Sequence, residues 1–135
     1  MSAFSPRERD LAKCEDMRLH AERAQRFLGA RTLAEFQADE LLQAAVIRTV
    51  EVIGEAARQV SEESRRRAPE IPWTLIIGMR NILVHDYGAV DLEKIYDVVH
   101  GHVPTLLRQL AALIPLLERD VGWTDKEDST AGSGG

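Results

Sequence analysis

The sequence predicts an all-α fold, an antiparallel up-and-down bundle of about four to five helices. Apolar residues recur every three or four positions along most of the chain, the period of an amphipathic helix. Aromatic residues make up only 5% of a chain that is rich in Ala, Leu, Arg and Glu, which favours helix over strand. The 135 residues suit one domain, predicted over 1–122, followed by a polar tail over 123–135 that we expect to be disordered.

The first helix is predicted to begin after Ser5. Ser5 is a suitable N-cap, Pro6 suits the first helical position, and Glu8 completes a capping box. An apolar stripe follows to Leu28, and Gly29 is a suitable helix stop.

A second capping box, Thr32-Leu-Ala-Glu35, opens a periodic run that no proline interrupts before Arg66. One helix of that length is above the usual range, so a break near Ala38–Asp39 is expected.

Pro72 can open the next helix, from Trp73 to about His85, which is apolar on most sides and is therefore predicted to be central and buried. Asp91 is the expected N-cap of a long last helix through Leu117. Pro104 should kink that helix and Pro115 should disturb its final turn.

Charge and cysteine content exclude several classes of protein. The formal charge is −5, so an RNA contact would have to be a local patch, and 14 of the 17 basic residues are Arg, which suits planar, paired contacts. The single cysteine, Cys14, excludes an internal disulfide and a multi-cysteine metal site. No apolar run has the length of a signal peptide or a membrane span, so we expect a cytoplasmic protein.

The segment with the strongest chemical signal is Gly78-Met-Arg-Asn-Ile-Leu-Val-His-Asp-Tyr-Gly88. Arg80 and Asn81 interrupt an otherwise apolar helix, and burying them is costly unless they are paired. Arg80 and His85 are five residues apart, about 140° around an ideal helix, so they do not share a face. Either the helix deforms at His85, or a second chain helps the two side chains to meet, as in a two-fold dimer.

Two interpretations of these residues remain open. In the functional one, Arg80 holds a phosphate, His85 moves a proton and Asn81 orients one of them, which amounts to phosphodiester chemistry. In the structural one, Arg80 pairs with Glu51 or Glu55 and His85 caps the helix.

Two other groups of side chains deserve mention. Arg65, Arg66 and Arg67, with Arg58 nearby, form the only basic cluster, which could guide RNA or a partner or simply complement a helix end. His100 and His102 supply only two potential metal ligands, so no metal and no cofactor is predicted.

The motif Arg80-Asn-Ile-Leu-Val-His85-Asp-Tyr87 resembles the Arg-x4-His-x-Tyr motif of HepT-like toxins, in the HEPN superfamily. The stretches Arg48 to Ala57 and Pro69 to Asn81 resemble the same family, and the likeness covers roughly Leu11 to Leu117.

The resemblance implies an all-α, usually dimeric, metal-independent ribonuclease. Arg80 and His85 match the family's catalytic pair, and Asn81 matches its polar residue after Arg. It also implies a toxin–antitoxin system, in which a nucleotidyltransferase antitoxin of the MNT type transfers AMP from ATP to Tyr87. Two other classes are kept as alternatives: a non-catalytic module that binds RNA or the antitoxin, and a structural dimer.

Overall fold

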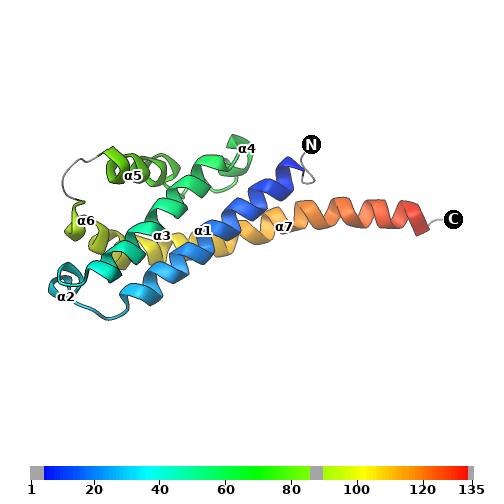
Figure 1. Ribbon diagram of the computed structural model, residues 1–135. Helices are drawn as coiled ribbons and strands as arrows, with labels where there is room; N and C mark the ends of the chain where they lie inside the picture. The colour runs from blue at the N-terminus through cyan, green and yellow to red at the C-terminus, as the bar shows by residue number, and fades with distance from the viewer. Residues whose placement is uncertain (1–4, 86–89, 134–135) are drawn as a thin grey trace.

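Four long helices alternate in direction along the bundle (Figure 1). They are α1 (Pro6–Leu28), α3 (Glu40–Gln59), α5 (Trp73–His85) and α7 (Val103–Ser133). The short helices α2 (Leu33–Gln37), α4 (Glu62–Arg65) and α6 (Leu92–Asp97) lie in the connections. This computed structural model describes residues 5–85 and 90–133, with the side chains of 80–85 and 123–133 left out of the description. Within those residues there is no strand, and the predicted all-α bundle is confirmed.

Local capping signals set most helix ends. Ser5 and Thr32 each form the predicted capping box, with Glu8 and Glu35, and the Asp91 side chain accepts a hydrogen bond from the Lys94 N–H at 3.1 Å. The chain leaves α1 through Gly29, whose positive φ of 55° is rarely adopted by other residues.

The predicted helix over 33–66 is broken twice. The break at Ala38–Asp39 is confirmed, and Asp39 caps α3 through the Leu42 N–H at 3.0 Å. A second break, which the sequence analysis did not predict, falls at Val60. Val60 is extended, and Ser61 then caps α4.

The second break is held by a residue far away in the sequence. The Asp10 carboxylate, on a side chain only 5% exposed, accepts hydrogen bonds from the Ser61 N–H at 2.9 Å and the Ser64 hydroxyl at 2.6 Å. It also accepts one from the Ser61 hydroxyl at 2.5 Å. Asp10 therefore ties the first turns of α1 to the corner between α3 and α4.

The long last helix contains a π-helical segment, η1 (Val98–His102), between α6 and α7. Its wide turn lies directly before Pro104, which lacks the N–H that an α-helix needs there. The Val103 N–H instead donates to the Val98 carbonyl, five residues back. Helix α7 continues through Pro115 to Ser133, past the start of the predicted tail. Because side chains after Gly122 lie outside the described residues, the domain boundary at 122 stays a prediction.

Two apolar clusters form the core. The first cluster joins the middle of α1, the second half of α3, the start of α5 and α7. The second cluster joins the end of α1, α2, the first half of α3, Met79 of α5, and α6 with η1. Helix α3 contributes to both and packs against both α1 and α5.

Candidate active site

Helix α5 carries the positions predicted to do chemistry. Its α-helical backbone runs from Trp73 through His85, as the sequence predicts, so it includes positions 80, 81 and 85. The side chains of Arg80, Asn81 and His85 lie outside the described residues, and so does all of Tyr87. A regular helix over these positions sets 80 and 85 about 140° apart around the axis and about 7.5 Å apart along it. Within one regular helix, positions 80 and 85 therefore do not share a face.

Helix α5 lies at the edge of the bundle on α3, and the prediction that it is central and buried is wrong (Figure 1). Trp73 and Met79 are each 8% exposed, whereas Leu75 is 63% exposed. Ile76 and Ile77 are half-buried. An all-round apolar pattern predicted burial on every side, but among the described side chains of α5, 73–79, the chain leaves Leu75 exposed.

Glu51 and Glu55, the predicted supporting residues, lie half-buried on α3. Glu51 accepts a hydrogen bond from Arg48 at 3.5 Å, and Glu55 accepts one from Arg58 at 2.7 Å. Together with Lys13 and Asp16 of α1, both carboxylates line a polar groove between α1 and α3. Whether either one pairs with Arg80 involves a side chain outside the described residues, so that alternative stays a prediction.

Most of the predicted basic cluster has structural partners. Arg65 donates to the carbonyls of Ala57 at 3.2 Å and Arg58 at 3.0 Å, which caps the end of α3. Its guanidinium also lies 6.0 Å from the centre of the Trp73 ring. Arg66 pairs with Glu62, and Arg67 pairs with Asp120 of α7.

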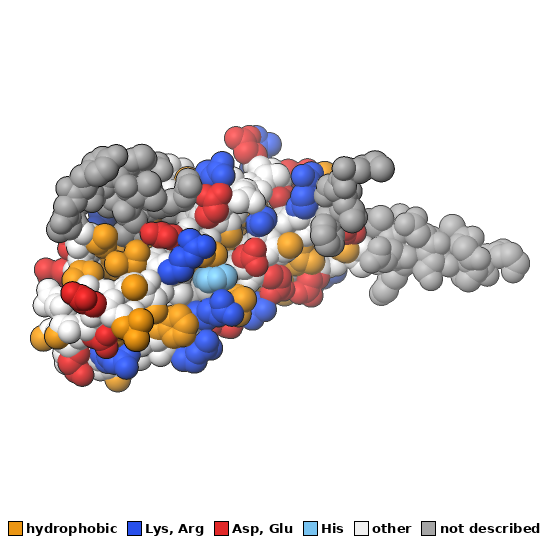
Figure 2. Space-filling view, viewed as in Figure 1, with side chains coloured by type: hydrophobic (Ala, Val, Ile, Leu, Met, Phe, Trp, Pro, Cys, Tyr) orange, Lys and Arg blue, Asp and Glu red, His pale blue; other side chains and the backbone are white. Residues whose placement is uncertain are grey.

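The cluster also lies far from the predicted catalytic histidine. Arg65 contacts the first residue of α5, and the helix rises about 18 Å from Trp73 to His85. On the face formed by α1 and α3, basic and acidic side chains alternate, without a large patch of one sign (Figure 2). Arg58, Arg65, Arg66 and Arg67 are therefore at the opposite end of α5 from His85.

The two histidines of η1 have different surroundings. The His100 ring packs against the Tyr96 ring with centroids 4.4 Å apart and planes tilted by 55°, and the Tyr96 hydroxyl donates to the Arg31 carbonyl at 2.9 Å. His102 instead lines a pocket. No group of three potential metal ligands occurs among the described residues.

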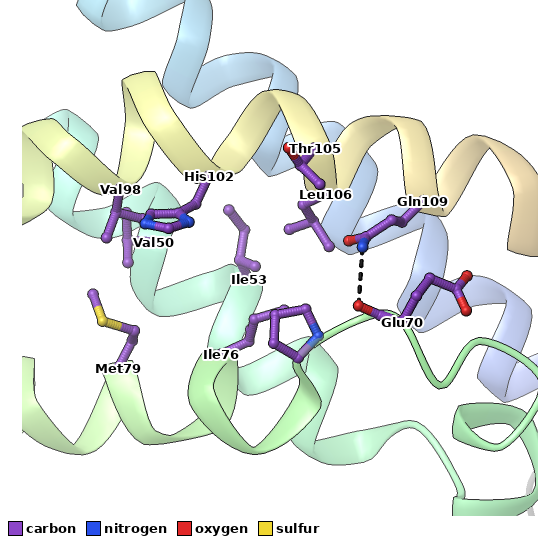
Figure 3. A pocket seen from close by; sticks show the side chains of 11 residues that line it. Val50, Ile53, Glu70, Ile76, Met79, Val98, His102, Thr105, Leu106 and Gln109 are labelled. Atoms are coloured by element: carbon purple, nitrogen blue, oxygen red, sulfur yellow. Dashed lines mark hydrogen bonds between the residues drawn. The ribbon is translucent and has the colours of Figure 1, made fainter.

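That pocket is an apolar slot of about 230 Å³. Val50 and Ile53 of α3 form its floor, while α5 forms one wall and η1 with α7 the other (Figure 3). The pocket could not be predicted from the sequence, because its lining comes from separate helices whose apolar residues look like ordinary core.

The lone thiol takes no part in this site. Cys14 is fully buried in the first cluster, and burial, followed by the nearby Asp10 carboxylate, raises its pKa to about 12. Such a thiol is not a nucleophile at neutral pH.

Comparison with known proteins identifies related sequences. The family described as Ribonuclease HepT-like matches residues 17–113. "Probable ribonuclease HepT" of Thermococcus cleftensis is 39% identical over 53% of this chain and 66% of its own length. "Putative RNase MJ0127" of Methanocaldococcus jannaschii is 35% identical over 68% of this chain and 76% of its own length. No solved structure matches the chain significantly.

Within the described residues, no helix combines the length and apolar character needed to cross a bilayer.

The family match spans both halves of the bundle and includes the whole of α5 with its Arg80 and His85 positions. The chain belongs to the HepT-like ribonuclease family.

Proposed function

We propose that the protein is a metal-independent RNA endonuclease and the toxin of a two-gene toxin–antitoxin system. The observation that carries the proposal is the Arg80, His85 and Tyr87 motif, which lies inside the stretch matched by the ribonuclease family. The proposal is also supported by the place of helix α5, whose backbone carries the first two positions and lies at the edge of the bundle (Figure 1).

The chemistry needs only the RNA, water and side chains of the motif. The 2′-hydroxyl of the substrate attacks the adjacent phosphorus, and the bond from phosphorus to the 5′-oxygen of the next nucleotide breaks. Arg80 binds the non-bridging phosphate oxygens, where negative charge grows. His85 either takes the proton from the 2′-hydroxyl or gives one to the leaving 5′-oxygen, water exchanges the other proton, and Asn81 orients one of these groups. The products are a 2′,3′-cyclic phosphate and a free 5′-hydroxyl.

A homodimer is part of the proposal. Positions 80 and 85 point to different sides of a regular helix, so one chain alone is poorly arranged to bring both to one phosphate. Leu75, 63% exposed on the same helix, is a large apolar side chain that a second copy would cover. A two-fold axis near α5 would bring Arg80 and His85 of the two copies together.

Regulation would act through Tyr87. A nucleotidyltransferase antitoxin of the MNT type transfers AMP from ATP to the tyrosine oxygen, and pyrophosphate leaves. The new phosphodiester would compete with RNA for Arg80, and the nucleoside would obstruct the site, because Tyr87 is only two residues from His85.

The test is RNA cleavage in EDTA by the wild type, Arg80→Ala and His85→Ala. Arg18→Ala is the matched control, since Arg18 lies on the surface of α1 and pairs with Glu15 and Glu22 of the same helix. We expect wild type and control to cut equally and the two motif variants to lose about 10² to 10⁴ in rate. Intact mass of each sample shows whether AMP is already attached, and Tyr87→Phe provides a chain that cannot be modified there.

Intact RNA with folded, unmodified wild type would refute the ribonuclease proposal. If Arg80→Ala then lost RNA affinity, the protein would be a binding module. If Arg80→Ala changed only stability and oligomeric state, the motif would be structural.

A further inference from the structure

We propose that the slot between α5 and α7 binds one base of the RNA substrate, an inference that rests on the proposed ribonuclease function. The residues that are known to line the slot all lie in the described part of the chain. Its shape, its lining and its position on α5 support the assignment.

The size of the slot suits a single ring system. Sites for whole small molecules usually hold about 300–1,000 Å³, and this slot holds about 230 Å³. Two helices form facing walls with α3 behind them (Figure 3). A narrow space between facing walls accepts a flat group better than a branched one.

The lining offers what a base needs. The His102 ring and the Met79 thioether lie at one end of the slot, and both pack well against an aromatic face (Figure 3). At the other end, Gln109 Nε2 donates to the Glu70 carbonyl at 2.9 Å, which holds the carboxamide in place. The carboxamide also carries an acceptor oxygen and a second N–H, suited to the polar edge of a base.

The position of the slot connects it to the proposed reaction. Ile76 and Met79 of α5 line it, and Met79 directly precedes Arg80 in the helix. A nucleotide whose phosphate lies near position 80 therefore has its base within reach of the slot. On this basis the slot positions the substrate and discriminates among bases, while the motif performs the chemistry.

The native methionines allow a direct test. The chain has three methionines: Met79 lines the slot, and Met17 is fully buried in the first cluster. In protein labelled with ¹³C at the methionine methyl groups, each of the four nucleoside 5′-monophosphates is titrated, with ribose 5-phosphate as the probe without a base. We expect at least one nucleotide to shift the Met79 signal while the Met17 signal and the ribose 5-phosphate spectrum stay unchanged.

Two variants test the location. Thr105 is exposed at the rim of the slot on α7, so Thr105→Phe should cover the opening without altering the core. Ala111→Phe adds the same ring at an exposed position of α7 that does not line the slot. Thr105→Phe should raise the apparent Kd for the nucleotide at least about fivefold, the lower limit for loss of one base contact, and Ala111→Phe should not. An unchanged Met17 signal shows that each variant is folded.

Several outcomes would overturn the assignment. These are an unmoved Met79 signal with all four nucleotides, an equal shift with ribose 5-phosphate, or a Met79 signal that moves only with protein concentration. The last result would show that a second copy covers the slot. Cleavage of RNA without a Met79 response would refute the base site alone, whereas a base-dependent Met79 response without cleavage would refute only the ribonuclease function.

Discussion

Replacing Asp10 by alanine should destabilise the fold far more than replacing any exposed acid on the same helix. The Asp10 carboxylate accepts three hydrogen bonds, from the Ser61 N–H, the Ser61 hydroxyl and the Ser64 hydroxyl, at 2.5 to 2.9 Å. A hydrogen bond to a charged group contributes about 1.5–3 kcal/mol, and a buried donor left without a partner costs about 1–3 kcal/mol. Because one carboxylate serves all three donors, the contributions do not add fully, and we expect a loss of about 3 kcal/mol.

The assay is urea unfolding followed by far-ultraviolet circular dichroism, with thermal unfolding beside it. A loss of about 3 kcal/mol is a large part of a typical stability and should lower Tm by roughly 10 °C for a chain of this size. Asp16→Ala is the control, since the Asp16 side chain is 48% exposed and its nearest cation, Lys13, is 3.8 Å away. That change should cost less than about 0.5 kcal/mol.

Asp10→Asn separates shape from charge. The amide keeps the volume and one acceptor oxygen but turns an NH₂ group toward donors, so an intermediate loss of about 2 kcal/mol is expected. If Asp10→Ala and Asp16→Ala cost the same, Asp10 would not hold the corner between α3 and α4, and the explanation of the break at Val60 would be wrong.

Three further predictions follow from the described side chains. Cys14 should not react with a disulfide reagent at pH 8 until the protein unfolds. Folding raises the pKa of the Cys14 thiol from 9.0 to about 12, so between these pH values only the unfolded thiol ionises. The free energy of unfolding should therefore fall as pH rises through that range, and this part of the pH dependence should be absent in Cys14→Ala. Arg65→Ala should lower the free energy of unfolding by about 1–2 kcal/mol, because the end of α3 loses its cap. Arg66→Ala removes only an exposed ion pair with Glu62 and should change the free energy of unfolding by less than about 0.5 kcal/mol in the same urea experiment. Leu75→Glu should leave the helical spectrum unchanged and convert a dimer to a monomer in light scattering; a dimer that persists would place the interface away from α5.

Local signals in the sequence were enough to predict where most helices begin or end. The caps at Ser5, Thr32 and Asp91 depend on side chains within three residues, so a short window contains the whole interaction. The break at Val60 could not be predicted in that way, because it depends on Asp10, about fifty residues earlier.

Features that depend on how the helices are arranged in space could not be predicted from the sequence either. The apolar pattern of α5 indicates that it buries surface, but not whether its own chain or another covers Leu75. The sequence predicted one helix from Trp73 to His85 that includes positions 80 and 85, and the structure confirms that helix. Predicting the slot would have required the relative positions of α3, α5 and α7, which the spacing of apolar residues along each helix does not contain.

The π-helical segment affects how the last helix of the bundle tolerates the deletion of a residue. Ile95 before it and Val99 within it pack into the second cluster, whereas Val103 and Leu106 after it pack into the first. The wide turn takes up one residue more than an α-turn, which keeps one apolar edge facing the bundle across both clusters. Deleting Gly101 would therefore convert the wide turn into an ordinary α-turn and leave α7 in nearly the same orientation relative to α6, so that both clusters could keep their partners. The same deletion in a regular stretch of α7 would rotate everything after it by about 100° and turn its apolar edge away from the bundle.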